Sequence, residues 1–415
     1  MGFSKQPFFS PFSKVIFPVL SVLALSSILA CAGSSDPAAQ ASLAANVEKF
    51  AVIATTDYTG SASHAIIGLD QPRTALLDPQ PSRDSKDVTI TCNGKYIYRI
   101  ERRNFGANGS VVKFSLDDPK QVIYDYSADD ADPSSSSNPI DIAFVNQNKA
   151  YLLRNMNNKI WIINPSAQNE AEFKIGEIDL SAYSPDHGVT PPAMSKGLII
   201  GNRLFILLQR LDAFYSPSVA SYIAVFNTDT DQEIDTGYGE AGLKGVKLDI
   251  RNPYGRLIYN NGTIYVAGTI FPDNPAWFST TWTDYKNYSG IQRINAATLE
   301  PDHNIIHKAV STITYLSVAS PDKGYFVEYI GAGNTRLRSF NPTTGVVSAS
   351  VIAGIGDSGD RDISDIALDS ENKLWIADFS IANMGMYVLN TADDTIEDGP
   401  ISTGLNPVAI SFCER

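Results

Sequence analysis

Apolar and polar residues alternate in short segments along most of the chain, a pattern typical of half-buried β-strands. One unit recurs: a short apolar strand, a turn rich in Asn, Gly or Asp, and a second strand that opens with an aromatic residue. Its copies are VTITCNGKYIYRI, IDIAFVNQNKAYLLR, GLIIGNRLFILL, RLIYNNGTIYVAG, YLSVASPDKGYFVEY and ISDIALDSENKLWIAD. The aromatic residues in this slot are Tyr96, Tyr151, Phe205, Tyr265, Phe326 and Trp375, and Phe50 fits it as well. The pattern predicts repeated antiparallel hairpins.

A third strand follows each hairpin and ends in a turn that contains Asn or Asp. The copies are FSLDDP, IINPSA, VFNTDT, RINAAT, SFNPTT and VLNTAD, with IIGLDQP near residue 68 as a looser seventh. An Asn or Asp side chain at this point can accept hydrogen bonds from its own turn. Equivalent positions fall at residues 115, 164, 227, 295, 341 and 390, so the base period lies in the high forties and two intervals, 164–227 and 227–295, are enlarged.

Repeated small sheets of this kind bury their faces only by stacking, and radial stacking leaves short, protected edges. We therefore predict an all-β fold, a seven-bladed β-propeller. The first unit lacks an innermost strand of its own, whereas the chain end, GLNPVAISF, has the pattern of a spare one. We predict that this C-terminal strand pairs with the N-terminal blade, beside residues 48–57, and closes the ring.

The repeats also carry a family resemblance. GLNPVAISF and SNPIDIAFVNQNKAYLL resemble the repeats of YVTN and YncE-like propellers, and ISDIALDSENKLWIAD resembles NHL or gluconolactonase-type repeats. The resemblance spans about residues 48–413. It implies a propeller of six to eight blades and leaves the chemistry open, because propellers host many functions.

The two enlarged intervals place their extra residues in loops that a propeller gathers on one face. The aromatic residues of these loops are Phe214, Tyr215, Tyr254, Phe271, Trp277, Phe278, Trp282, Tyr285 and Tyr288. Flat rings on long loops suit recognition of a protein, peptide or glycan; the alternative is that the loops fold back and bury the rings. Arginines flank the same face and could neutralise its acids or bind an anionic ligand: Arg102, Arg103, Arg154, Arg210, Arg251 and Arg256.

An acidic run, DSGDRDISD, precedes the inner strand of the last blade and brings together Asp357, Asp360, Asp362 and Asp365. The resemblance to gluconolactonase-like enzymes implies that such carboxylates could hold a divalent metal and activate water at the central channel. The alternative is a solvated acidic loop. Of these two alternatives, we favour the solvated loop over the divalent metal. We predict no other cofactor.

Three further motifs have simpler interpretations. Gly237–Gly242 matches G-x-G-x-x-G but lies between strands, without the helix of a nucleotide-binding unit. The spaced oxygens of Asn227–Glu233 lack the Gly and terminal Glu of an EF-hand and fall on a repeat turn. His303 and His307 lie in a loop-like stretch and not on an evident helix, so we expect no metal pair there.

Cys92 ends the inner strand of the second blade and Cys413 ends the closing strand of the first. These blades would be neighbours, so a disulfide is plausible in an oxidising compartment and would pin the C-terminus. Two buried free thiols are the alternative.

The N-terminus predicts export. Lys5 and Lys14 precede an apolar run that ends in Ile28-Leu29-Ala30-Cys31, which resembles a bacterial lipobox. We expect residues 1–30 to be a lipoprotein signal peptide, residues 31–46 a flexible tether lipid-anchored at Cys31, and residues 47–415 the propeller domain. Ala32 follows the cysteine, which by analogy favours the outer membrane, in the periplasmic or surface leaflet.

Charge narrows the partners. The 415 residues carry a net charge of −13, with 43% hydrophobic and 19% charged residues, so a large core can form while nucleic acid is disfavoured as a partner. The membrane is then contacted only through the lipid anchor. We expect an exported, non-catalytic binding or scaffold module that uses its aromatic loops. The alternatives are a metal-dependent hydrolase or lactonase at the channel and an envelope-assembly scaffold.

Overall fold

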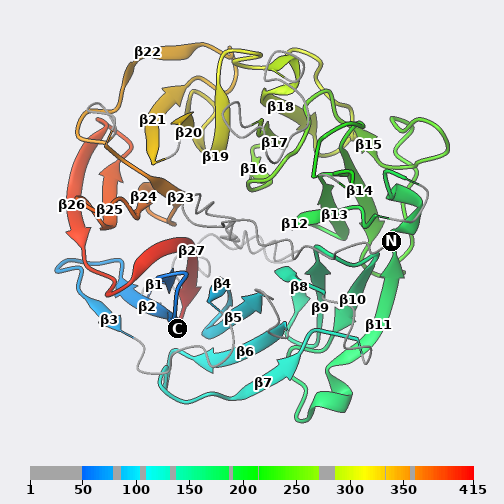
Figure 1. The fold of residues 1–415 in the computed structure, drawn as a ribbon, viewed down its shortest axis with the longest axis horizontal. Helices are drawn as coiled ribbons and strands as arrows, with labels where there is room; N and C mark the ends of the chain where they lie inside the picture. Colours follow the sequence, from blue (N-terminus) through cyan, green and yellow to red (C-terminus); the bar gives the residue numbers. More distant parts are fainter. Residues whose placement is uncertain are drawn as a thin grey trace, which may run out of the picture.

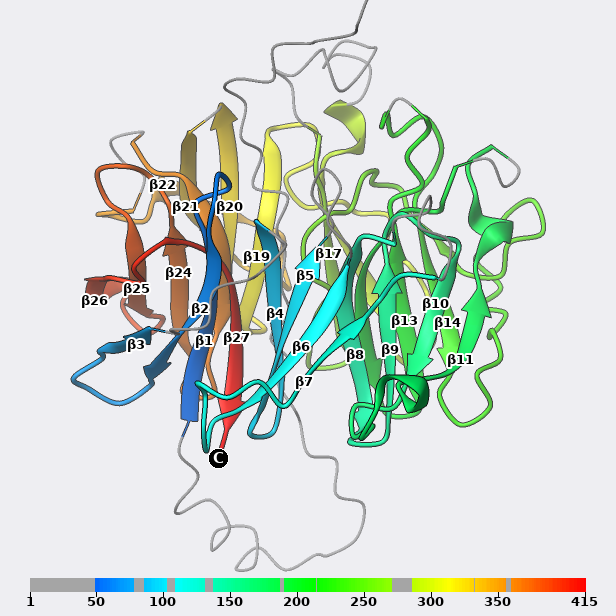
Figure 2. The same ribbon diagram turned by 60° about the horizontal axis from the view of Figure 1, so that its bottom comes forward.

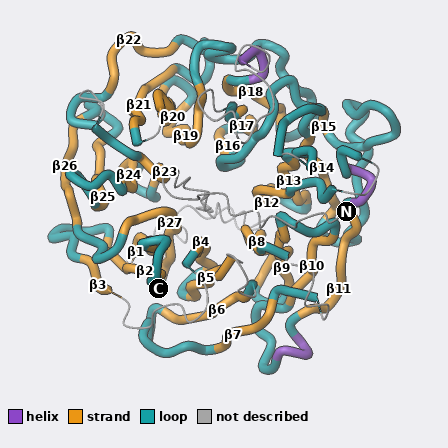
Figure 3. The backbone as a smooth tube through the Cα atoms, viewed as in Figure 1, coloured by secondary structure: helices purple, strands orange, loops and turns teal. Residues whose placement is uncertain are grey.

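The computed structural model describes residues 49–77, 86–102, 109–130, 137–186, 190–213, 215–270, 286–331, 333–355 and 360–415. Seven antiparallel sheets stand side by side in a ring (Figure 1). Strands dominate, and the described helices are three short 3-10 turns, η2 (Glu170–Glu172), η3 (Ser181–Tyr183) and η4 (Lys286–Tyr288) (Figure 3). The predicted all-β, seven-bladed propeller is confirmed.

The first four blades follow the repeat. Blade 1 contains β27 (Asn406–Glu414), β1 (Lys49–Thr56), β2 (Ala62–Gly68) and β3 (Ala75–Leu77). Blade 2 contains β4 (Asp87–Asn93), β5 (Tyr96–Arg102), β6 (Ser110–Ser115) and β7 (Tyr124–Ser127). Blade 3 contains β8 (Pro139–Asn146), β9 (Lys149–Arg154), β10 (Lys159–Ile163) and β11 (Lys174–Asp179). Blade 4 contains β12 (Met194–Ile200), β13 (Arg203–Leu208), β14 (Tyr222–Asn227) and β15 (Val246–Lys247).

The remaining blades complete the ring. Blade 5 has three described strands, β16 (Ile258–Asn260), β17 (Thr263–Gly268) and β18 (Gly290–Asn295). Blade 6 contains β19 (Thr312–Ser320), β20 (Lys323–Gly331), β21 (Asn334–Phe340) and β22 (Val347–Val351). Blade 7 contains β23 (Ile363–Leu368), β24 (Lys373–Asp378), β25 (Gly385–Asn390) and β26 (Thr395–Ile401).

The last strand closes the ring as the pattern predicts. β27 lies inside β1 in the sheet of blade 1, and the two pair in antiparallel register, with Phe50 opposite Cys413 and Ile53 opposite Ile410. Figure 2 shows the two strands side by side, with the C-terminus at the lower edge of the ring. Because β27 supplies the innermost strand of blade 1, the inner edge of β1 has a hydrogen-bonded neighbour and the ends of the described chain are joined.

A disulfide reinforces this closure. Cys92 at the end of β4 is bonded to Cys413 at the end of β27, across 321 residues of sequence, and their Cα atoms lie 5.3 Å apart. The bond therefore ties the closing strand of blade 1 to the innermost strand of blade 2. The alternative of two free thiols does not describe this structure.

The recurring aromatic residues fill the spaces between blades. Tyr151, Phe205, Tyr265, Phe326 and Trp375 are all buried within apolar clusters shared by neighbouring sheets. Trp375 is fully buried and donates its indole N–H to Asp369 Oδ2 at 2.8 Å, so the buried polar edge of its ring is satisfied. The slot identified in the sequence is thus the packing position that holds adjacent blades together.

The Asn-containing turns behave as predicted. Asn227 Oδ1 accepts hydrogen bonds from the backbone N–H groups of Asp229 and Thr230 at 2.8 and 3.1 Å. Asn295 and Asn341 repeat the arrangement in blades 5 and 6. The oxygens of Asn227–Glu233 therefore build a turn, and Gly237–Gly242 lies in the connection between two strands, β14 and β15.

The two faces of the ring carry different connections. One carries the loops from the second to the third strand of each blade and the loops from one blade to the next, and we call it the insertion face. The opposite hairpin face carries the short turns between first and second strands, such as residues 94–95 and 147–148. β1 runs from the hairpin face to the insertion face, so the described chain begins and ends at the hairpin face. Within the described part of the chain, no helix has the length and apolar character to cross a bilayer.

Candidate functional site

The enlarged loops lie on the insertion face, but much of their aromatic content lies outside the described residues. This applies to Phe214, Phe271, Trp277, Phe278, Trp282 and Tyr285, as it does to Asp357 and Cys31. Tyr215 lies in the β13–β14 loop with a positive φ of 59° and is 55% exposed. Tyr254 lies in the link before β16 and is half-buried.

Two of the predicted site residues pack against their own loops. The Arg251 guanidinium lies 3.8 Å from the centre of the Tyr288 ring, and its Nη1 donates to the carbonyls of Pro217 and Ser218. Arg210 donates to the carbonyls of Tyr183 and Ala220, both at 2.8 Å. These groups rigidify the loops of blades 4 and 5, so their role here is positioning.

Among the described residues, six of the thirteen exposed large apolar side chains lie on the insertion face. They come from loops of blades 3 to 7 and are Met156, Tyr215, Val310, Ile330, Ile381 and Met384. Single exposed apolar side chains are ordinary on a folded protein, whereas a contiguous group of them is a candidate contact surface.

Two buried aspartates join the inner strands of adjacent blades. Asp141 on β8 and Asp365 on β23 occupy the same place in the motifs PIDIA and ISDIA. Asp141 Oδ2 accepts from the N–H of Gly197 on β12, and Asp365 Oδ2 accepts from the N–H of Ile410 on β27, both at 2.9 Å. Each carboxylate therefore fastens the innermost strand of the next blade.

Arg256 lies at the propeller axis and not on the rim. It precedes β16 in blade 5, and its guanidinium forms a two-point ion pair with Asp365 of blade 7, with Nε 3.2 Å from Oδ1. Its Nη2 also donates to the carbonyl of Ile410 at 3.2 Å. Burial raises the pKa of Asp365 to about 6, while the Arg256 charge acts to lower it. Of the two roles considered for this arginine, the structure shows neutralisation of an acid.

Polar groups from five parts of the ring meet where the axis reaches the insertion face. We call them the axial cluster: Tyr58 (β1–β2 loop), Asp87 (β4), Arg102 (β5), Tyr254 (before β16), Tyr315 (β19) and Asp362 (before β23). The Tyr58 hydroxyl interacts electrostatically with Asp87, Tyr254, Arg102 and Asp362, and the Tyr315 hydroxyl with Tyr254, Tyr58 and Asp362. Burial, and then the neighbouring aspartates and tyrosines, raise the pKa of both hydroxyls well above the usual value, whereas the Arg102 charge acts to lower that of Tyr58.

The acidic run contributes to this cluster through Asp362. Burial, followed by the nearby Asp378 carboxylate, raises the pKa of Asp362 to about 7. Asp360 points instead toward Arg361 and Asn383 and keeps 53% of its side chain exposed. In the part of the chain that is described, no three His, Cys, Asp or Glu side chains are close enough to hold a metal ion together.

The two histidines of the blade 5–6 link do not converge. His303 Nδ1 lies 2.6 Å from Asp249 in an exposed contact. His307 Nε2 lies 2.9 Å from Ser311 Oγ and 3.6 Å from Glu328. Hydrogen bonds, from His307 first, hold the pKa of Glu328 down at about 2. Because Ser311 and Glu328 share one ring nitrogen, the group lacks the two-sided relay of a catalytic triad.

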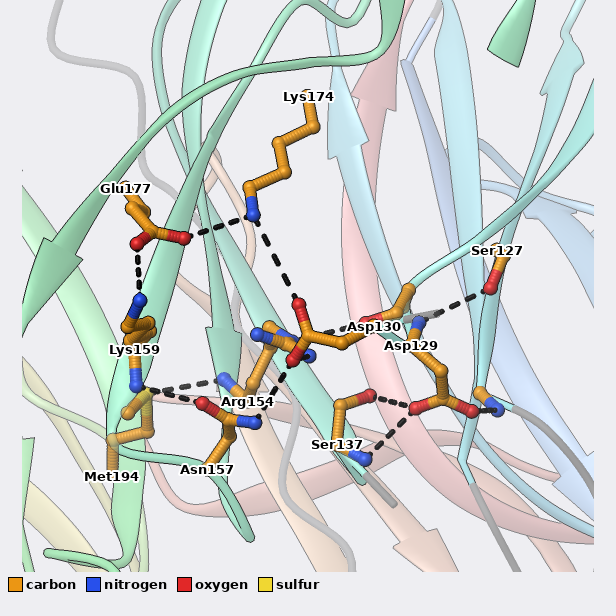
Figure 4. A network of polar contacts seen from close by, with 12 residues as sticks. Ser127, Asp129, Asp130, Ser137, Arg154, Asn157, Lys159, Lys174, Glu177 and Met194 are labelled. Atoms are coloured by element: carbon orange, nitrogen blue, oxygen red, sulfur yellow. Dashed lines mark hydrogen bonds and ion pairs between the residues drawn. The ribbon is translucent and has the colours of Figure 1, made fainter. Parts of the chain in front are cut away.

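A network between blades 2 and 3 borders a surface hollow of about 330 Å³ (Figure 4). Arg154 Nη2 donates to Asp130 at 2.6 Å, and Asp129 accepts from the backbone N–H groups of Gly109 and Ser137, each at 2.8 Å. Lys174 bonds Glu177 at 2.9 Å. The residues that line the hollow are Asp130, Met156, Asn157, Asn158, Lys159 and Pro191. Its charges are internally paired, so we interpret the network as a bond between blades.

Sequence reasoning named Tyr254, Asp362 and Arg102 but missed the other three members of the axial cluster. Tyr58, Asp87 and Tyr315 lie far apart in the sequence and belong to three different blades. Their positions in the repeat were the available signal. Asp87 and Tyr315 lie near the insertion-face ends of the inner strands β4 and β19, and Tyr58 lies in an insertion-face loop.

No protein family and no curated protein matches the sequence. Solved structures match over most of the chain. A protein from Lactobacillus plantarum has a TM-score of 0.58 at 12% identity, covering 88% of this chain and 99% of that one. A 6-phosphogluconolactonase-like protein from Bacteroides fragilis has 0.55 at 12%, covering 88% and 98%. Virginiamycin B lyase from Staphylococcus aureus has 0.51 at 14%, covering 89% and 96%. At these identities the likeness is one of fold, the β-propeller.

Proposed function

We propose that this protein is an exported propeller, lipid-anchored at Cys31 to the outer membrane, that binds a protein, peptide or glycan of the cell envelope. It acts as a rigid platform for its loops and catalyses no reaction of its own. The contact surface is the insertion face, with the aromatic loops of blades 4 and 5 at its centre. Nucleic acid is not a partner, because the chain is acidic.

One observation supports this proposal most directly: the exposed apolar side chains on the loops of the insertion face. Tyr215 and Ile381 lie on second-to-third-strand loops of blades 4 and 7, which the rigid sheets below hold in place. Loops on a rigid scaffold bind at a low entropic cost, because little of the scaffold has to be ordered on binding.

Crosslinking tests the proposal. The lipidated chain in envelope preparations is expected to form crosslinks from the insertion face to a defined partner, and Trp277→Ala with Trp282→Ala should remove them. Tyr238→Ala is the matched control, because Tyr238 is exposed in the blade 4 connection between β14 and β15. An unchanged set of crosslinks in the double variant would place the contact elsewhere. A partner that is part of an assembly machine would favour the envelope-scaffold alternative.

A metal-dependent hydrolase or lactonase at the axis is the second candidate, and Asp362 is the observation that favours it, because this partly buried aspartate stands just before β23, the innermost strand of blade 7. This candidate requires saturable binding of Ca²⁺, Mg²⁺, Mn²⁺ or Zn²⁺ and metal-dependent opening of a lactone, both reduced in Asp362→Asn. Titration of each ion by calorimetry, followed by a lactone assay, separates it from the binding proposal.

A further inference from the structure

The axial cluster is a site of its own, distinct from the aromatic loops. Its members come from inner and second strands, the β1–β2 loop and inter-blade links, and they meet only because the ring is closed. Gly255 shows how close the approach is: a Cβ there would lie 2.7 Å from the carbonyl of Thr314, next to Tyr315. The link that carries Tyr254 therefore rests directly on β19.

The arginines in and around the cluster are each paired with a carboxylate, whereas the Asp362 carboxylate is not paired with any arginine that the structure describes. Arg102 is paired with Asp87 at 3.3 Å and bonds Asn138 at 3.1 Å, and Arg256 is paired with Asp365. Arg361, next to Asp362 in sequence, bonds Asp378 at 2.9 Å. Each arginine is thus offset by a different carboxylate. Among the described residues, the Asp362 carboxylate has no hydrogen bond or ion pair.

Tyr58 supplies a second unmet polar group. Its hydroxyl oxygen is buried and has no hydrogen-bond partner among the described residues. The ring is held in place by a strongly built turn: Tyr58 has a φ of 56°, and Asp57 Oδ1 accepts from the N–H groups of Thr59, Gly60 and Ser61 at 2.7–2.8 Å. A buried hydroxyl without a partner costs about 1–3 kcal/mol, which a bound donor would recover.

We propose that the axial cluster binds a primary ammonium group. The Asp362 carboxylate and the Tyr58 hydroxyl oxygen accept its N–H bonds, and the electron-rich rings of Tyr58, Tyr254 and Tyr315 favour a cation beside them. An anion is disfavoured, because all three arginines in and around the cluster are already paired with carboxylates. The ligand is then a lysine side chain of a peptide or the amine of an amino sugar.

The same arrangement makes binding depend on pH. The groups recorded as interacting with Asp362 are the Asp378 carboxylate and the hydroxyls of Tyr58 and Tyr315. Arg361, its neighbour in sequence, is bonded to Asp378. Because burial and Asp378 raise the pKa of Asp362 to about 7, the carboxylate that pairs with the ammonium is present above that pH and is protonated below it. For a lysine amine, which keeps its proton until about pH 10, affinity should be constant from about pH 8 to pH 9 and fall about tenfold for each pH unit below 7. An amino-sugar amine loses its own proton at about pH 8, so its affinity should also fall above that pH.

Calorimetry on the full chain tests the inference, with Nα-acetyl-lysine methylamide and glucosamine as the two probes and acetyl-norleucine methylamide as the neutral control. One ammonium probe should bind at pH 8 while the neutral control does not, and the preferred probe identifies the source of the amine. Asp362→Asn should weaken binding at least tenfold. Asp360→Asn, a change of the same kind two residues away on an exposed side chain, should not.

Three results would overturn it: neither ammonium probe binds at pH 8, Asp362→Asn binds as tightly as the parent chain, or binding needs a divalent ion and disappears in EDTA. If Asp362→Asn does not fold, titrating the parent chain from pH 8 to pH 5.5 removes the same charge. The Trp277→Ala, Trp282→Ala variant should keep ammonium binding, so a failure here and a failure of the proposed partner surface can be told apart.

Discussion

Single carboxylates act as fasteners between blades in this protein. Asp141 and Asp365 sit in the same repeat position, and each accepts a hydrogen bond from the backbone of the next inner strand. At Asp365 a second requirement arises, because a fully buried carboxylate needs a counter-charge. Arg256 supplies that charge from blade 5, which is not adjacent to blade 7. We therefore expect its replacement to lower the free energy of unfolding strongly.

Replacing Arg256 with alanine should lower the free energy of unfolding by about 3–5 kcal/mol, because Asp365 would remain buried without its partner. Urea unfolding followed by tryptophan fluorescence measures this. Lys247→Ala is the control: it removes an ion pair with Glu240 that is largely exposed, which should cost at most about 1 kcal/mol. Equal effects of the two changes would show that the axial pair has no special weight.

At the scale of single elements, the turns after the third strands bond the second strands of neighbouring blades. Asp231 and Asp394 each stand four residues after a turn Asn, with a φ of 57° and 60°. Each binds the first tyrosine of the preceding blade's second strand, Tyr151 and Tyr325. At the same turn position blade 6 has Gly345 with a φ of 75°, so Tyr265 of blade 5 has no such aspartate.

Tyr325→Phe should therefore destabilise the protein by about 1–2 kcal/mol, because it removes a 2.6 Å hydrogen bond to the charged Asp394. Tyr265→Phe, in the equivalent slot of blade 5, should cost less. A double-mutant cycle with Asp394→Ala would show whether the difference comes from this contact. No coupling in the cycle would contradict the inter-blade role of the turn.

At the scale of the whole molecule, closure holds the ring together. β27 and β1 pair over almost their full lengths, and the Cys92–Cys413 bond attaches that pair to blade 2. The apolar clusters are each shared by neighbouring sheets, so a blade that loses one neighbour exposes the core on that side. Opening the ring at β27 would therefore weaken blades 1, 2 and 7 together.

Replacing both Cys92 and Cys413 with serine should lower the free energy of unfolding by about 2–5 kcal/mol, because the unfolded chain would lose a cross-link that spans most of its length. Thermal unfolding with and without reducing agent is the measurement. Reduction should bring the parent chain to the stability of the variant and leave the variant unchanged. A parent chain indifferent to reduction would contradict a stabilising bridge.

The position of the chain ends predicts orientation on a membrane. Lys49 begins β1 at the hairpin face, and the tether proposed above, counted from Cys31 to Lys49, would have a root-mean-square span of about 25 Å as a flexible chain. Lipid-anchored protein should therefore hold the hairpin face nearer the bilayer and turn the insertion face away. Val346 is exposed in the β21–β22 turn on the hairpin face, and Ile381 is exposed in the β24–β25 loop on the insertion face. Energy transfer to a membrane acceptor from a dye at Val346→Cys should therefore exceed that from a dye at Ile381→Cys. The reverse order would refute this orientation.

The repeat pattern was enough to predict the ring. Alternating residues, Asn-containing turns and a spare terminal strand are local features, and the blade number and the pairing of β27 with β1 follow from counting them. The Asx turns were equally predictable, because Asn227 bonds only its own neighbours in sequence. How the Trp277 and Trp282 loop folds is not part of the described structure, so its role rests on composition.

Only the tertiary structure decided which side chains meet at the axis. Arg256 was expected on the loop rim. It pairs instead with Asp365 of blade 7, because in a closed ring the inner strands of all blades face the same axis. Tyr58 and Tyr315 gave no signal in the sequence, because a single tyrosine in a loop or strand has no distinguishing pattern. Its role depends on the polar residues that other blades place beside it. Alternation in a sequence specifies which face of a strand is buried; it does not specify which distant residues share the centre, because that depends on the curvature of the whole ring.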